Sequence, residues 1–294
     1  MSYVPTGHWT QLKKLQYIEE TTFGTTPTAS PVFSSAGEIE SVNENTEIAM
    51  KRYRSLGSED LYQFLKNGQL HSFEVKYQPI TSALIKYGTQ VQGGGAGTID
   101  KSLSLVYSED INDIENYLFY RGSRCDQVDV EVTNEAVMVT QNFICKEITT
   151  PSTSHGLTTP TFAPANTGTP WTGPDSGSNP FTHNALNYDV DKFKFTVNRA
   201  LDAIRPNGES LIKFLVPTIR TITGEFDVVR KDAALITDCK NLTARAASYV
   251  LKSATSTATF TDMVLIAFAT SRPATATEAL RDSLKFEAKS ISVS

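Results

Sequence analysis

Residues 42–86 read VNENTEIAMKRYRSLGSEDLYQFLKNGQLHSFEVKYQPITSALIK, and residues 197–237 read VNRALDAIRPNGESLIKFLVPTIRTITGEFDVVRKDAALIT. Both stretches contain a Val-Asn start, a Phe-Leu pair, an alternating strand and an Ala-Leu-Ile run, in that order. The spacing grows from 150 residues at Phe64 and Phe214 to 151 at the Ala-Leu-Ile run, so one residue of slippage aligns these two features. An internal repeat of this length decides architecture. It predicts two copies of one small β-rich unit.

Composition also favours a β protein. A chain of 294 residues is expected to form one or two domains. The 15 Phe and 11 Tyr residues favour strands over helices. The net charge of −5 lacks the basic footprint of proteins that wrap nucleic acid.

The three cysteines, Cys125, Cys145 and Cys239, are widely spaced and form no CxxC pair. They are predicted to be buried free thiols, which indicates assembly in a reducing cytosol. The N-terminus lacks the basic and apolar regions of a secretory signal. No apolar run approaches the ~20 residues that cross a bilayer. We expect no membrane contact and no cofactor.

Changes in composition divide the chain into four segments. They are an N-terminal arm (1–35), a first β unit (36–149), a linker rich in Pro, Gly and Thr (150–187) and a second β unit (188–294). Two interpretations of the linker stay open. It is either a solvated tether or an ordered surface loop anchored by Trp171 and Phe181.

Alternating apolar residues predict strands in both units, for example at Phe73, Val75 and Tyr77 and again around Phe193 and Phe226. A short helix is expected after the second strand of each unit, because capping residues precede an apolar stripe there. Residues 108–120 are predicted to form an amphipathic helical insert. The expected fold is mostly β, with two tandem barrels or sandwiches that each carry a short flanking helix.

The sequence offers no arrangement typical of an active site. Three of the four histidines, His8, His155 and His183, lie in the arm or the linker, and His71 lies at a strand entrance. No cysteine has a histidine at a recognised catalytic spacing, and no carboxylate cluster has the spacing of a calcium loop. The glycine-rich residues 93–97 follow a helix and precede a strand, the reverse of a phosphate-binding loop. We therefore predict that the chain is not an enzyme and has no metal site.

Residues 46–68 are too charged for a core and longer than ordinary loops. A solvated loop is one interpretation. A protein–protein contact is favoured, because interfaces concentrate Tyr and Arg. The candidate contact residues are Arg52, Tyr53, Arg54, Leu56, Glu59 and Asp60.

Three stretches, 19–27, 37–41 and 54–60, resemble the opening of tail tube proteins from long-tailed phages and related archaeal viruses. The resemblance continues in the linker that leads into residues 193–198. It also includes the charged strand with a central glycine at 220–226.

This resemblance implies a virion tail protein, assembled in the host cytoplasm, whose rings stack into a tube that delivers the genome. The loop between the first two strands would then contact the adjacent ring. Family members with one barrel per chain form hexamers. Two barrels per chain imply a ring of three chains with pseudo-sixfold symmetry, with a homohexamer as the alternative. Implied partners are other copies of the chain, the sheath, tape-measure and tail terminator or tip proteins, with DNA only as transient cargo.

A tube through which DNA passes must not bind the DNA tightly, so we expect a neutral to acidic inner wall. Acidic residues on the wet faces of the predicted strands are candidates to line it. They are Glu74, Asp129, Glu131, Glu225 and Asp227.

Two other classes of function stay open. A carbohydrate-binding or adhesive β-sandwich of a virion or cell surface would use exposed Trp9, Trp171 or tyrosine clusters. A β-rich hydrolase would need an acid or nucleophile pair that the sequence does not present.

Overall fold

The structure is a computed structural model that describes residues 14–54, 61–90, 101–108, 118–133, 135–149, 157–158, 160–163, 168–172, 181–206, 209–252, 256–271 and 280–294. For residues 50–54, 61–67 and 108 only the backbone is described. Among these residues, no helix is long and apolar enough to span a membrane.

The described residues of the N-terminal half form eight strands and one helix. They are β1 (Lys14–Glu19), β2 (Ser34–Ser35), β3 (Gly37–Arg54), β4 (Leu61–Pro79), α1 (Ala83–Thr89), β5 (Leu103–Ser108), β6 (Leu118–Val132), β7 (Val137–Cys145) and β8 (Glu147–Thr149). The C-terminal half contains β9 (Phe181–His183), β10 (Leu186–Tyr188), β11 (Val190–Asn198), β12 (Leu201–Ile204), β13 (Phe214–Pro217), β14 (Thr221–Val229), α2 (Ala234–Lys240), β15 (Arg245–Lys252), β16 (Ser256–Ser271) and β17 (Arg281–Val293).

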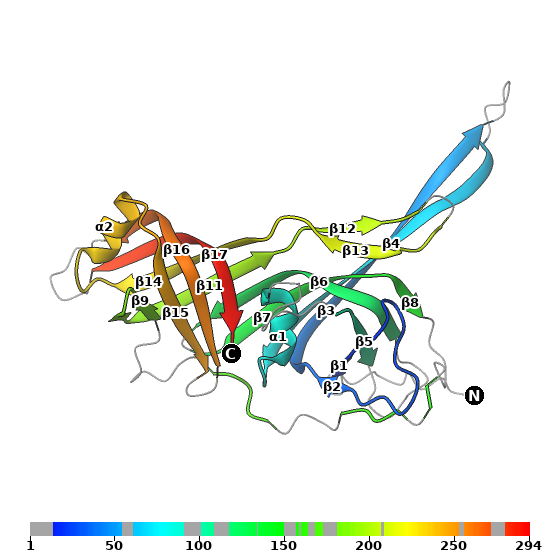
Figure 1. Ribbon diagram of the computed structural model, residues 1–294, viewed down its shortest axis with the longest axis horizontal. Helices are drawn as coiled ribbons and strands as arrows, with labels where there is room; N and C mark the ends of the chain where they lie inside the picture. Colours follow the sequence, from blue (N-terminus) through cyan, green and yellow to red (C-terminus); the bar gives the residue numbers. More distant parts are fainter. Residues whose placement is uncertain are drawn as a thin grey trace, which may run out of the picture.

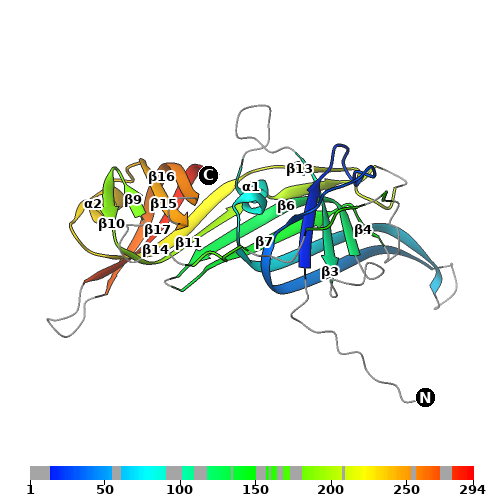
Figure 2. The same ribbon diagram turned by 90° about the horizontal axis from the view of Figure 1, so that it is seen from below.

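The protein is mostly β, as predicted, but its strands form one large sheet and not two separate closed barrels. Fifteen of the described strands belong to this sheet, and β12 and β13 form a separate pair. The two halves join where β6 pairs with β11, from Phe193 opposite Val132 to Asn198 opposite Gln127. Figure 2 shows β7, β6, β11 and β14 running side by side through the middle of the molecule.

Strand β6 joins the parts of the sheet because its two ends have different neighbours. Its first residues pair with β5 and β8, and its later residues pair with β7 and β11. The change occurs between Ser123 and Arg124, just after Gly122, whose φ of 64° is in the left-handed region that glycine adopts without strain. A bulge between Cys125 and Gln127 adds to the bend.

Six pairings of the N-terminal half have counterparts in the C-terminal half, whereas the β6–β8 and β12–β13 pairs have none among the described residues. In the N-terminal half β1 pairs with β2 and β5, β3 with β4, β4 with β7, and β6 with β5 and β7. The corresponding pairs of the C-terminal half are β9 with β10 and β15, β11 with β14, β14 with β17, and β16 with β15 and β17. Helix α1 lies between β4 and β5 in the chain, and helix α2 lies between the corresponding strands β14 and β15.

One core extends through both halves. The apolar residues of β4, β6, β7, β11 and β14 point to the same side of the sheet and belong to a single buried cluster. Helix α1 covers this side, with Leu84 and Ile85 buried against it. The opposite side of these strands carries the alternating polar residues, as expected for a sheet with one wet face.

Two segments predicted to be irregular contain ordered structure. Residues 14–19 of the predicted arm form β1, which pairs with β5. In the predicted linker, Trp171 is 2% exposed and its indole N–H donates to the Ile80 carbonyl oxygen at 2.9 Å. Phe181 is fully buried in β9. The described parts of the linker therefore favour the anchored loop over the solvated tether.

The predicted loop 46–68 is largely a hairpin. Strand β3 continues to Arg54 and β4 begins at Leu61, and the two strands pair to their ends. Figure 1 shows this hairpin projecting beyond the rest of the molecule. Its base is held where the Arg205 guanidinium donates to the Gln69 carbonyl oxygen at 2.8 Å.

Candidate functional site

The described histidines have structural contacts. His71 Nδ1 lies 3.0 Å from the Thr46 hydroxyl on the adjacent strand. His183 is buried, with Nδ1 3.9 Å from an Asp238 carboxylate oxygen. Burial lowers the pKa of His183, Asp238 opposes this shift, and Arg245 adds to it.

The cysteines are free and buried, as predicted. Burial raises the pKa of Cys125 and of Cys145 to about 12, so both are thiols near neutral pH. Among the described residues, no group of three or more His, Cys, Asp or Glu side chains could hold a metal ion.

The five acidic candidates for the inner wall lie on strands of one continuous sheet, on the side opposite the core. Each alternates with buried residues of its own strand and is itself half-buried. Glu74 accepts a hydrogen bond from the Asn43 amide at 2.8 Å. Asp129 accepts one from Thr196 across the junction of β6 and β11.

Lysines share this charged face. Glu131, Lys194, Glu225 and Lys285 lie opposite one another in turn, across β6, β11, β14 and β17. Lys192 forms an ion pair with Glu131 at 2.9 Å. Hydrogen bonding to Lys192 lowers the pKa of Glu131, and the pKa of Lys192 is raised in return. The face is therefore mixed in charge and not uniformly acidic.

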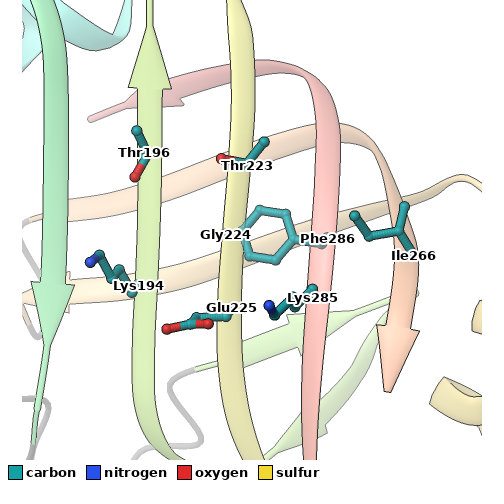
Figure 3. A pocket seen from close by; sticks show the side chains of 8 residues that line it. All are labelled: Lys194, Thr196, Thr223, Gly224, Glu225, Ile266, Lys285 and Phe286. Carbon is teal, nitrogen blue, oxygen red and sulfur yellow. The ribbon is translucent and has the colours of Figure 1, made fainter. Parts of the chain in front are cut away.

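A hollow of about 270 Å³ lies over β14 beside Gly224 (Figure 3). A Cβ on Gly224 would approach the Phe286 ring to 2.3 Å and the Lys194 carbonyl oxygen to 2.4 Å. The glycine in this charged strand is thus required by close packing. Lys194, Glu225 and Lys285 surround the hollow, which belongs to the charged face.

Besides the short strands β2, β8, β10, β12 and β13, two long strands have an edge without a neighbour among the described residues. Strand β3 pairs only with β4, and β16 from Val264 to Ser271 pairs only with β17. Large apolar side chains are exposed on both strands, namely Ile48 on β3 and Ile266 and Phe268 on β16. Periodicity assigns residues to the faces of a strand and carries no information about its edges, so the sequence did not reveal this.

The candidate contact residues are only partly described. Arg52, Tyr53 and Arg54 lie at the outer end of β3, so they belong to a strand and not to a loop. Leu56, Glu59 and Asp60 lie outside the described residues. The positions of the first three, at the end of the projecting hairpin, suit contact with another molecule.

The alternative of a carbohydrate-binding or adhesive β-sandwich expects exposed aromatic side chains, and one of these is not exposed. Trp171, which it places on the surface, is buried and hydrogen-bonded to the chain. Trp9 lies outside the described residues.

These features define an extended β-sheet protein with a charged face, a projecting hairpin and long strands, β3 and β16, whose edges have no neighbour in the part of the chain that the structure describes. A family model described as phage tail tube protein matches residues 10–288 of this chain. The chain belongs to this family, as its resemblance predicted. A comparison with curated protein sequences finds no match. Membership implies a component of the virion tail that assembles with other tail proteins into a tube.

Proposed function

We propose that the chain forms stacked rings of the tail tube and that the viral genome passes through them into the host cell. The observation that carries this proposal is the set of six strand pairings in one half of the chain that have counterparts in the other half. Two such units per chain favour a ring of three chains with pseudo-sixfold symmetry, and a homohexamer is the alternative. A heterologous (head-to-tail) contact between chains makes a closed ring when the rotation that relates neighbouring chains closes.

The charged face is the proposed inner wall. Support comes from the continuity of this face across β6 and β11, which joins the two units without a break. Its alternating carboxylates and ammonium groups neutralise each other locally. A wall of this kind releases few counterions from DNA and so holds it weakly.

The β3–β4 hairpin is the proposed contact between stacked rings. It projects from the sheet and carries Arg52, Tyr53 and Arg54 at its outer end (Figure 1). Arg and Tyr are enriched at protein interfaces. Leu56, Glu59 and Asp60 follow directly in the sequence and belong to the same proposed contact.

Further partners are proposed from the family. They are the sheath, tape-measure and tail terminator or tip proteins, with DNA as transient cargo only. Assembly in the host cytoplasm is part of the same proposal.

Purified protein tests the ring proposal directly. We expect negative-stain images with rings or tubes, and a sedimenting species of three times the 32.2 kDa chain mass. A species of six chains would favour the homohexamer. A monomer at every concentration, with no tubes under crowding, would exclude both.

A further inference from the structure

Strands β6 and β11 pair with each other where the two halves of the chain join. Each of them corresponds to a strand of the other half whose edge has no neighbour among the described residues. Strand β11 corresponds to β3, and β6 corresponds to β16, because they occupy the same places in the two pairing series. Within the chain, β6 and β11 are neighbours. Among the described residues, β16 and β3 have no such neighbour.

Bulges fix which residues correspond. The β3–β4 pair has a bulge between Ile39 and Ser41, and the β11–β14 pair has one between Val190 and Lys192. Residues of β3 therefore correspond to residues of β11 that are 151 positions later. This is the spacing that also relates α1 to α2.

The second correspondence is fixed in the same way. The β6–β7 pair has a bulge between Cys125 and Gln127, and the β16–β17 pair has one between Leu265 and Ala267. Residues of β6 thus correspond to residues of β16 that are 140 positions later. Phe268 occupies the place of Val128.

Burial differs between the corresponding residues. Val128 is fully buried in the β6–β11 junction, whereas Phe268 is 41% exposed. Asp126 at the first bulge corresponds to Ile266, which is 46% exposed, and Arg199 corresponds to Ile48, which is 50% exposed. The uncovered edges are thus more apolar at these positions than the junction that is already formed.

We propose that the β16 edge of one chain pairs with the β3 edge of a second copy, in the register of the β6–β11 junction. This inference rests on the proposed ring. Transferring the observed register gives antiparallel pairs in which Asn43 lies opposite Ser271, Asn45 opposite Ala269, and Glu47 opposite Ala267 of the other chain.

Chemistry at the bulge supports a second copy as the partner. In the junction, the Asp126 backbone oxygen accepts the Arg199 N–H at 2.8 Å. The transferred register brings Ile266 to Ile48 at this place, so two exposed apolar side chains cover each other. Main-chain pairing at a strand edge supplies affinity, and such apolar contacts select the partner. The pairing also removes two edges that invite aggregation.

The test uses disulfide cross-linking in assembled rings. The matched variant Asn45→Cys/Ala269→Cys places two cysteines directly opposite each other between chains, within the Cα separation that a disulfide spans. The control Asn43→Cys/Ala267→Cys uses the same strands with cysteines that the register keeps apart. The native cysteines are buried and remain in place.

We expect the matched variant to run as covalent multimers on non-reducing gels and the control to remain monomeric. The longest species is expected to contain three chains for the proposed ring. Rings without cross-linking in the matched variant, or with equal cross-linking in the control, would overturn the inference and leave the ring proposal standing. Absence of rings in the unmodified protein would remove both.

A second variant tests the apolar contact. Phe268→Asp places a carboxylate where its counterpart is fully buried, so ring association is expected to weaken by at least about 100-fold. Leu242→Asn is the control, because Leu242 is exposed, belongs to neither β3 nor β16 and has a φ of 49° that Asn tolerates. Unchanged association of a folded Phe268→Asp chain would contradict the proposed pairing.

Discussion

Arg199 donates a hydrogen bond from Nη1 to the carbonyl oxygen of Tyr87, 2.6 Å away. Arg199 directly follows β11 and Tyr87 lies in α1, so this contact joins the two halves of the chain. Arg220 makes a second contact of the same kind with the Thr89 carbonyl oxygen. Both guanidinium groups meet the C-terminal end of α1, where free carbonyl oxygens and the helix dipole favour a cation.

Arg199→Met is expected to lower the free energy of unfolding by about 2 kcal/mol, because a charged hydrogen bond is lost in a buried place. Urea denaturation measures the change. Arg281→Met is the matched control: Arg281 forms a surface ion pair with Asp191 at 3.2 Å, and such pairs contribute about 0 to 1 kcal/mol. Equal losses in the two variants would show that Arg199 does not couple the halves.

Glu20→Gln is expected to destabilise the corner between β1, β5 and β6. The buried Glu20 carboxylate accepts hydrogen bonds from the Ser102 and Ser104 hydroxyls and from the Gly24 and Gly122 N–H groups, at 2.6 to 2.9 Å. An amide turns one acceptor into a donor facing other donors, at a cost of about 2 to 4 kcal/mol. Thermal and urea unfolding measure it, with the exposed Glu38→Gln as control. A loss no larger than that of the control would contradict this role.

His183 is expected to make stability depend on pH. Burial lowers its folded-state pKa, so below about pH 6.5 the unfolded chain binds a proton more readily than the folded chain. Stability is therefore lost as the pH falls from 7 towards 5. His183→Gln removes this titration, and its unfolding free energy is expected to fall less over the same range. Parallel pH profiles for the two proteins would exclude His183 as the cause.

Glu225→Lys is expected to make assembled tubes bind duplex DNA. It replaces a carboxylate of the charged face between Lys194 and Lys285 with a third ammonium group. Binding should weaken steeply as salt rises, because phosphate contacts release counterions. Unmodified tubes are expected to bind negligibly at physiological salt. Asp232→Lys changes the charge equally at the start of α2 and should leave binding low. Equal DNA binding by both variants would place the wall elsewhere.

Replacing both Arg52 and Arg54 with Glu is expected to impair stacking of rings and to leave each chain folded. Both residues lie at the end of the projecting hairpin, and like charges at an interface cost several kcal/mol. Tube length by electron microscopy and circular dichroism measure the two effects. Lys231→Glu/Lys240→Glu, with one residue before α2 and the other at its end, controls for the charge change. Tubes of normal length from the arginine variant would remove the hairpin from the interface.

The strands that alternate clearly in the sequence, such as Phe73–Tyr77 and Phe193–Val197, are strands in the structure, because one of their faces is buried. The outer part of β3 and β4 could not be predicted as strand, because the exposed residues of β3 give no alternation. Leu118–Tyr120, predicted as the end of a helix, begin β6. The local amino-acid sequence contains no signal that these residues pair with β5 and β8.

The acidic face could be predicted, because alternation separates wet from buried positions. The lysines that lie beside these acidic residues could not be predicted, because the neighbours of a residue on adjacent strands depend on the pairing register, which periodicity does not determine. The same limit explains the single sheet. Apolar alternation predicts the buried face of β6 and of β11, but not that the two strands lie side by side.

The junction of β6 and β11 also has a consequence for synthesis of the chain. Ribosomes add about 5 to 20 residues per second, so β6 leaves the ribosome several seconds before the end of β11. During this interval its edge from Gln127 to Val132 has no partner from its own chain. Polysomes hold many nascent chains close together, and this edge is then open to the wrong neighbour. A chaperone that covers β-strand edges is therefore expected to raise the yield of native protein.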